Sequence, residues 1–201
     1  MSDDPLRMFL VVRRGAVATL EKAAVLGGAA AVACVRRFEA DPAHADAFRE
    51  WRPRPGKVCL RARSPAQWEE VLEQPHEAAG DAVAALPPRR RSERGPALER
   101  LQAMASDLGD PPSEPRGDGL AYVLNPKLEM SSGKVVAQVA HAAVMAADAL
   151  PDWPGTPAHL HAPGPAEFDA LCRRDDLVAR VVDAGLTEVP PGTVTVLALA
   201  R

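Results

Sequence analysis

The chain has few cysteines, little net charge and no long apolar segment. Its cysteines are odd in number and lack the spacing of metal ligands: Cys34, Cys59 and Cys172. This pattern predicts reduced, mostly buried thiols in a cytoplasmic protein rather than a disulfide framework. A net charge of −3 creates no global positive field for nucleic acid, so any contact with RNA requires a local patch.

The uncharged run Ala23–Val35 is too short to span a bilayer. It ends in Ala-Val-Ala-Cys-Val, which faintly resembles a lipoprotein cleavage site. However, the preceding stretch is long, carries Asp3, Asp4 and Glu21, and already contains a strand-like run at Met8–Val12. We therefore expect neither a signal peptide nor a contact with the membrane, and we expect a cytoplasmic location.

The length of 201 residues fits one large or two small domains, and 47% hydrophobic residues suffice for a core. The chain has twenty arginines but only four lysines, and it is rich in alanine and proline. This composition is typical of GC-rich coding, so runs of arginine are less informative than usual. Lys134 is correspondingly more noteworthy.

Proline and glycine place the clearest boundary at 109–119, where the sequence disfavours both helix and strand. This linker divides an N-terminal α/β region, residues 1–108, from a C-terminal domain, residues 120–201. Strands and helices alternate in the C-terminal domain, which predicts an α/β sheet covered by helices. The expected elements are strands at 120–124, 158–162, 177–182 and 193–200, and helices at 133–150 and 165–172.

The N-terminal region repeats this order. We expect a strand at 10–12, a helix at 18–37 and a strand at 57–61. Lys22 lies in the first helix where Lys134 lies in the second. Trp51 precedes the strand at 57–61 as Trp153 precedes the strand at 158–162. Two local matches support the repeat but require gaps: Ser64–Glu69 with Gly164–Asp169, and Ala85–Pro88 with Glu188–Pro191. Internal duplication and chance likeness both remain open. The stretch 87–96 is expected to be irregular, and 97–106 to form a short amphipathic helix.

The polar positions of the C-terminal domain do not recur in the first copy. Gln138 corresponds to Leu26, His141 to Ala29, and Asp183 to Gly80. If the halves are related, the first is a degenerate repeat that serves as a scaffold or binding partner.

The helix expected from Gly133 carries one polar stripe. At about 100° per residue, Lys134, Gln138, His141 and Met145 fall within a sector roughly 60° wide, and the other faces are alanine and valine. Such a stripe is poorly suited to a core and well suited to lining a cleft.

Other motifs carry less weight. Gly133-Lys134 fails as a phosphate loop, because Leu128 stands where that motif needs glycine. His159 and His161 share a strand face but have no third ligand at a suggestive spacing. The arginines of Arg89–Arg94 fit either a phosphate site or a solvated surface.

A second polar block follows the strand at 177–182. Asp183 ends this apolar strand at the edge of the sheet, Thr187 lies between two turns, and Thr195 lies in the last strand. Taken alone, the block fits an ordinary turn followed by a strand.

Together the two blocks closely resemble the type 2 peptidyl-tRNA hydrolases of archaea and eukaryotes, over about Leu120 to Leu199. The motifs are Met130-x-x-Gly133-Lys134-x-x-Ala137-Gln138-x-x-His141-Ala142 and Asp183-Ala184-Gly185-x-Thr187, continued by Pro191-Gly192-Thr193-x-Thr195-Val196-Leu197. The resemblance implies a mixed four-stranded sheet with helices on both faces. It also implies hydrolysis of the ester between a peptide and tRNA, without metal or cofactor.

Carried over by position, the family's functional residues are Lys134, Gln138, Asp183, Thr187 and Thr195, with His141 in the helix motif. The chain departs from the family in three ways. Asn125 and Lys127 replace the usual Arg and Asp, the stretch between the motifs is short, and the N-terminal half is additional.

Ester hydrolysis needs an oriented water, a proton acceptor and donors for the oxyanion. We expect Asp183 to orient or deprotonate the water, Lys134 to pair with Asp183, and Gln138 and the two threonines to supply hydrogen bonds. His141 fits a packing role as well as a catalytic one. The alternative is a non-catalytic relative that binds RNA or protein. The chain could be a homodimer, or a pseudo-dimer through its N-terminal half.

Overall fold

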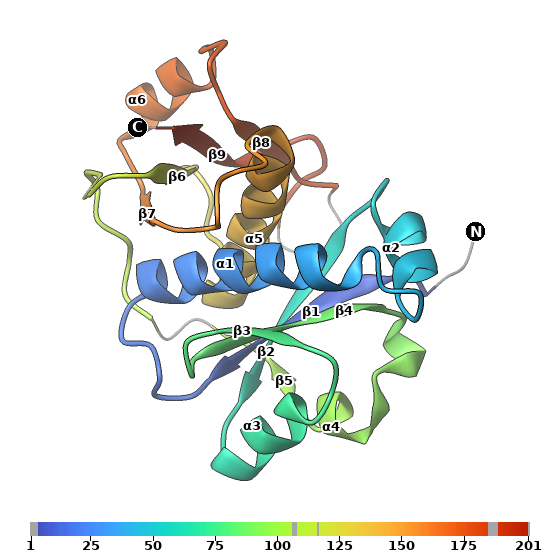
Figure 1. The fold of residues 1–201 in the computed structure, drawn as a ribbon. Coiled ribbons are helices and arrows are strands. Elements are labelled where there is room, and N and C mark those ends of the chain that lie inside the picture. Colours follow the sequence, from blue (N-terminus) through green and yellow to red (C-terminus); the bar gives the residue numbers. More distant parts are fainter. Residues whose placement is uncertain (1–3, 106–107, 116, 185–188, 201) are drawn as a thin grey trace.

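Two mixed sheets with two helices between them form the fold (Figure 1). The computed structural model describes residues 4–105, 108–115, 117–184 and 189–200. The sheet of the N-terminal half has the strand order β3-β4-β1-β2-β5, and that of the C-terminal half has the order β7-β6-β9-β8.

The N-terminal elements are β1 (Arg7–Arg13), α1 (Leu20–Phe38), α2 (Ala45–Trp51), β2 (Gly56–Ala62), α3 (Pro65–Leu72), β3 (Glu77–Ala79), β4 (Val83–Arg89), the 3-10 helix η1 (Arg91–Glu93), α4 (Gly95–Glu99) and β5 (Gln102–Ala103). The C-terminal elements are β6 (Leu120–Leu124), α5 (Ser132–Ala149), β7 (Ala158–His161), α6 (Pro165–Leu171), β8 (Ala179–Val182) and β9 (Val194–Ala200).

The long helices α1 and α5 begin in the same way. The Thr19 hydroxyl accepts a hydrogen bond from the Lys22 amide at 3.1 Å, and the Ser131 hydroxyl accepts one from the Lys134 amide at 3.2 Å. Each cap satisfies an amide that has no partner within the helix. The two lysines are therefore the third residues of equivalent helices, as the sequence comparison predicted.

Alternation along β1 divides the apolar residues between two cores. Met8, Leu10 and Val12 face the core that contains α1 and α5, whereas Phe9 and Val11 face the core under α3 and α4. Strand β6 contributes Tyr122 to the first of these cores from the opposite side. The helices α1 and α5 thus form one apolar layer between both sheets, and the two halves share one core.

The two halves have the same topology. In each, the first strand lies between a parallel second strand and an antiparallel last strand, and the third strand pairs with the last. The equivalent register positions are Leu10 between Cys59 and Ala85, and Tyr122 between Leu160 and Ala198. The predicted mixed four-stranded sheet with helices on both faces is confirmed for the C-terminal half, and the matching strand order supports duplication. The N-terminal sheet gains β5 at its edge.

The contacts between the halves are reciprocal. Arg36, the seventeenth residue of α1, donates to the carbonyl oxygens of Pro151 at 2.9 Å and Trp153 at 2.5 Å, just before β7. Asp148, the seventeenth residue of α5, accepts from Arg52 at 2.7 Å, just before β2. Helix α1 also packs on β7, and α5 on β2. Such reciprocity is typical of an isologous interface between two copies.

The helix predicted at 97–106 is wrong. Helix α4 ends at Glu99, and Gln102 and Ala103 pair antiparallel with β2. The amide of Met104 then donates to the Cys59 carbonyl at 3.1 Å. The open edge of β2 provides hydrogen bonds that outweigh the weak helical preference of this segment.

The irregular stretch predicted at 87–96 is also partly wrong, because β4 continues through Pro87 and Pro88 to Arg89. The register of β1 and β4 shifts between Arg7 and Phe9, and β3 pairs with β4 only at residues 83–85. Proline is tolerated where a bulge or an unpaired side removes the need for an amide donor. The match of Ala85–Pro88 with 188–191 is likewise wrong, since Ala85 has the register position of Ala198 in β9.

Among the described residues, no helix combines the length and the apolar character needed to cross a bilayer.

Candidate functional site

A buried chain of polar contacts connects α5 to the end of β8 and to β9. The Lys134 ammonium donates to Oδ2 of Asp183 at 2.5 Å, and Nε2 of Gln138 donates to the same oxygen at 2.8 Å. The Thr195 hydroxyl donates to Oε1 of Gln138 at 2.7 Å. Three segments that are distant in sequence thus supply one continuous network.

Each residue of this network is positioned by its secondary structure. Lys134 and Gln138 are one helical turn apart on the same face of α5. Asp183 directly follows β8, and its backbone closes the neck of the loop to β9: its amide donates to the Thr193 carbonyl and its carbonyl accepts from Gly192, both at 2.9 Å. The pairing of β8 with β9 shifts register between Val181 and Val182, just before Asp183. Such bulges reorient the side chain that follows.

The network is largely removed from solvent. The side chains of Lys134 and Asp183 are 12% and 6% exposed, and Thr195 is fully buried. A buried charge is tolerated when it is paired and hydrogen-bonded, as here. The partners also orient the Gln138 amide, because a carboxylate can only accept and the threonine hydroxyl needs an acceptor.

His141 lies on the same side of α5 but is not hydrogen-bonded within the described part of the chain. Burial, and secondly the charge of Lys57, lower the pKa of His141 to about 3, while Asp183 acts in the opposite direction. The imidazole is therefore neutral near pH 7 and a weak proton acceptor. The geometry joins Lys134, Gln138, Asp183 and Thr195, and it leaves His141 beside them. Thr187 lies outside the described residues.

Asn125 and Lys127, the two residues before the first motif that differ from the family's usual Arg and Asp, have structural roles. The Asn125 side chain donates to the Val194 carbonyl at 2.8 Å and accepts from the Lys127 amide at 3.0 Å, which fixes the end of β6 against β9. Lys127 forms an ion pair with Asp169 of α6 at 2.7 Å. Both residues support the sheet next to the network rather than joining it.

Comparison with known proteins shows the family to which the chain belongs. The profile of the family described as Peptidyl-tRNA hydrolase PTH2 matches residues 119–162. The Peptidyl-tRNA hydrolase of Thermococcus onnurineus (strain NA1) is 37% identical over 92 residues, covering 38% of this chain and 78% of that protein. The chain belongs to the PTH2 family. No solved structure matches it significantly.

The family match ends within the fold of the C-terminal half. It spans β6, α5 and β7 and contains Lys134, Gln138 and His141. Asp183 and Thr195 lie beyond it, and they enter the network because β9 pairs with β6, β8 pairs with β9, and α5 packs on both β8 and β9.

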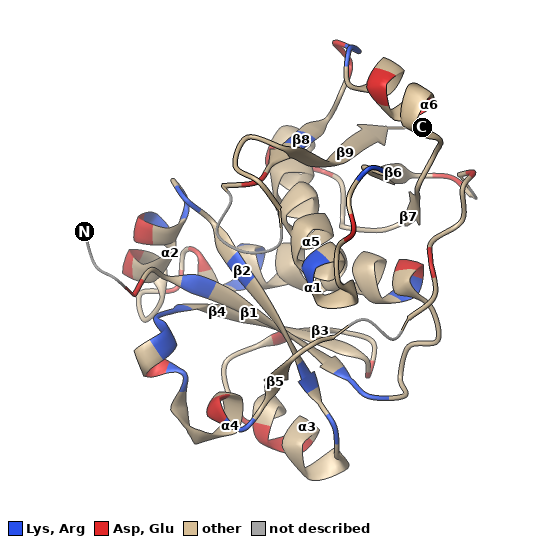
Figure 2. Ribbon diagram, turned by 180° about the vertical axis from the view of Figure 1, so that it is seen from behind, with Lys and Arg blue, Asp and Glu red and all other residues tan. Residues whose placement is uncertain are grey.

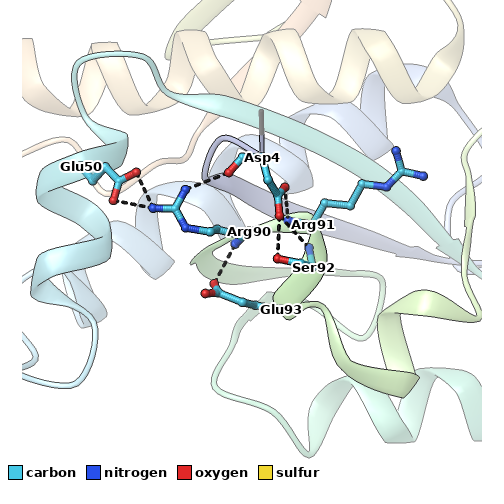
Figure 3. A network of polar contacts seen from close by, with 6 residues as sticks. All are labelled: Asp4, Glu50, Arg90, Arg91, Ser92 and Glu93. Carbon is cyan, nitrogen blue, oxygen red and sulfur yellow. Dashed lines mark hydrogen bonds and ion pairs between the residues drawn. The ribbon is translucent and has the colours of Figure 1, made fainter. Parts of the chain in front are cut away.

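The arginine-rich stretch, which fitted either a phosphate site or a solvated surface, has internal partners (Figure 3). The Arg90 guanidinium donates to both carboxylate oxygens of Glu50, at 2.7 and 2.8 Å, and to the Asp4 carbonyl at 2.8 Å. The Asp4 carboxylate accepts from the amides of Arg91 and Ser92 and from the Ser92 hydroxyl, and these bonds lower its pKa. The contacts favour a role in fixing the start of the chain.

The histidines of β7 also do not form a metal site. His159 and His161 are buried, with ring centroids 5.9 Å apart. Within the described residues, no group of three or more metal-ligating side chains occurs.

The sequence reasoning overlooked Lys57 of β2, which lies close enough to His141 to influence its pKa. Lysine is scarce in this chain, so Lys57 is as unusual as Lys134.

Proposed function

We propose that this protein hydrolyses the ester that joins a peptide, or an N-blocked amino acid, to the 3′ end of tRNA, and so recycles the tRNA. Membership of the PTH2 family and the name of the Thermococcus relative support this activity. The observation that carries it is the network in which Lys134 and Gln138 converge on one oxygen of Asp183. Among the described residues, the fold assembles this set in the C-terminal half alone.

The proposed reaction begins with a water molecule held by Asp183. The carboxylate accepts the proton as the water oxygen attacks the ester carbonyl carbon, and a tetrahedral oxyanion forms. Lys134 is the cation nearest to the carboxylate and stabilises the developing negative charge. The bond to the ribose oxygen then breaks, and that oxygen takes up the proton, so the products are a free peptide acid and tRNA.

Gln138 and Thr195 act through Asp183 in this proposal. The two bonds from Thr195 to Gln138 and from Gln138 to Asp183 hold the carboxylate in one orientation. We assign these two residues a positioning role and propose Thr187 as a further hydrogen-bond donor. His141, neutral near pH 7, packs beside the site.

The direct test is release of peptide from purified N-acetyl-aminoacyl-tRNA, with and without a chelator. We expect hydrolysis that the chelator does not change, and loss of most of it in Asp183→Asn and in Lys134→Ala. Lys22→Ala is the matched control, because Lys22 is the equivalent exposed lysine of α1. It should retain full activity.

The outcomes separate the two functions considered for the chain. Binding of tRNA in a gel shift without hydrolysis would favour a non-catalytic binding protein. Neither binding nor hydrolysis would contradict both functions.

The reciprocal packing of the halves further supports an internal pseudo-dimer acting in the cytoplasm on peptidyl-tRNA. We expect a monomer by light scattering after gel filtration, since α1 already covers α5. A stable dimer of the whole chain would contradict this.

A further inference from the structure

Strand β2 of the N-terminal half directs a row of side chains toward α5. Cys59 belongs to the core around α1 and α5, whereas Leu60 belongs to the core under α3. Because side chains alternate along a strand, Lys57 and Arg61 share the face of Cys59. Helix α5 packs directly on β2, and Figure 2 shows basic residues on both elements. Lys57 and Arg61 thus lie on the face of β2 that is turned toward the helix with the polar stripe.

The start of α5 fixes how β2 and α5 lie together. At Gly133 an added Cβ would approach the Met104 carbonyl oxygen to 2.5 Å, and Met104 is hydrogen-bonded to Cys59 through its amide. The Cys59 position of β2 is therefore adjacent to the first turn of α5, where Lys134 lies. Lys57 lies two residues before Cys59 in β2 and is close enough to His141 of α5 to lower its pKa.

The pseudo-symmetric position offers an internal comparison. Cys59 corresponds to Leu160 of β7, so Ala158 and Ala162 take the places of Lys57 and Arg61. That strand packs on α1, where the polar stripe is also missing. Of the two equivalent strands, the one that carries cations is therefore the one beside the helix with the catalytic set.

Lys57 has an environment suited to an anion. Its ammonium lies 4.7 Å from the centre of the Trp51 ring and 3.5 Å from the Pro55 carbonyl oxygen. Arg52 and Asp148 lie near enough to shift the pKa of Lys57 in opposite directions, but within the described ranges Asp148 pairs with Arg52 and no carboxylate lies at ion-pair distance from Lys57. Lys134, by contrast, is already paired with Asp183. A half-buried ammonium without a counterion gains stability when an anionic group binds beside it.

We propose that Lys57 and Arg61 bind the phosphates next to the ester at the 3′ end of tRNA, so that the first half forms one wall of the substrate site. The proposal rests on the proposed function for the identity of the substrate. It explains how a chain with a net charge of −3 binds a polyanion through a local cationic row. It also gives the first half a role that needs no catalytic residues of its own.

The test compares Lys57→Met, Arg61→Met and the double variant with wild type on two substrates. One is N-acetyl-aminoacyl-tRNA, and the other is N-acetyl-aminoacyl-adenosine, which has the same ester and no phosphate. Methionine keeps the apolar stem and removes the charge. Lys22→Met is the matched control on α1, and thermal unfolding verifies that each variant is folded.

On the tRNA substrate we expect each single variant to raise KM about tenfold, the effect of removing one charge-assisted hydrogen bond. The slope of log(KM) against log(salt) should fall by about 0.7 for each phosphate that the variant no longer binds. The adenosine ester should show no comparable loss, and Lys22→Met should match wild type on both substrates.

Equal losses on both substrates would overturn the proposal, and so would an unchanged KM and salt slope on the tRNA substrate. If wild type hydrolyses neither substrate, the proposed function fails. Gel-shift affinity for deacylated tRNA then decides the inference separately: weaker binding by the Lys57 and Arg61 variants supports it, and wild-type affinity overturns it.

Discussion

Replacing Lys134 by methionine, alone and together with Asp183→Asn, separates the role of the ion pair in folding from its role in catalysis. The two side chains are 12% and 6% exposed, with Nζ and Oδ2 2.5 Å apart. Removing one partner of a buried pair typically costs about 3–5 kcal/mol, because the other charge stays buried. Gln138 continues to donate to the Asp183 carboxylate in Lys134→Met, so we expect about 3 kcal/mol, the lower end of that range.

The double variant should recover most of this stability. It leaves no buried charge at the pair, and the amide oxygen introduced by Asp183→Asn can still accept from Gln138. Its free energy of unfolding should therefore lie within about 1 kcal/mol of wild type. Urea unfolding of wild type, both single variants and the double variant gives the coupling energy, and peptide release from N-acetyl-aminoacyl-tRNA gives the activity. We expect all three variants to be inactive. Additive decreases in stability would refute the coupling, and an active double variant would refute the catalytic role of the pair.

Three further predictions concern the residues around this pair. Gln138→Leu should lower kcat at least tenfold, because it removes the hydrogen bond that orients the Asp183 carboxylate. The buried Thr195 hydroxyl also loses Gln138 as its acceptor. Single-turnover kinetics measure the chemical step. Gly133→Ala should destabilise the fold by about 1–3 kcal/mol, because its Cβ would meet the Met104 carbonyl oxygen at 2.5 Å; urea unfolding measures this. Burial lowers the pKa of Lys57 from 10.5 to about 7, so the native state binds fewer protons than the unfolded chain in that interval. The free energy of unfolding should therefore rise from pH 7 to pH 10.5, and Lys57→Met should remove that contribution.

The C-terminal half was predictable because its local signals agree with one another. Apolar strands, a glycine-proline linker and a polar helical stripe each marked an element, and strand β6 has the predicted bounds. The stripe also identified Lys134 and Gln138 before any contact was known. The sequence also predicted that Asp183 ends a strand. That Lys134 and Gln138 donate to the same oxygen of Asp183 depends on how α5 packs on the sheet, which the sequence does not indicate.

The errors arose where tertiary pairing overrides local preference. Residues 102–103 form a strand because β2 has an open edge, and no signal within the segment indicates this. Pro87 and Pro88 can continue β4 because they lie at the register shift between β1 and β4, where the strand does not need their amide donors. The role proposed for Lys57 depends on the packing of β2 on a helix of the other half, which periodicity alone does not indicate.

The β3–β4 and β8–β9 hairpins differ at the positions of Asp183 and Thr195, and the described part of the first half has no network like that of Lys134, Gln138, Asp183 and Thr195. Ala82 has the register position of Thr195, and Gly80 follows β3 as Asp183 follows β8. Only Asp81 separates Gly80 from Ala82, whereas residues 184–194 separate Asp183 from Thr195. The first copy therefore lacks the segment that contains Thr187, and point substitutions alone would not restore the site.

The presence of two halves of the same topology in one chain permits the division of roles that we propose. In a homodimer every interface residue serves two identical sites, so a substitution in one site changes the other. Here α1 can specialise in packing: an added Cβ at Gly27 or Gly28 would meet Val136 or Ala143 of α5 at 2.7 or 3.0 Å. The first half thus packs closely against α5, and its β2 places Lys57 near His141 of that helix. Under the proposed function, a first half that is not needed for catalysis can form part of the substrate site of the second half.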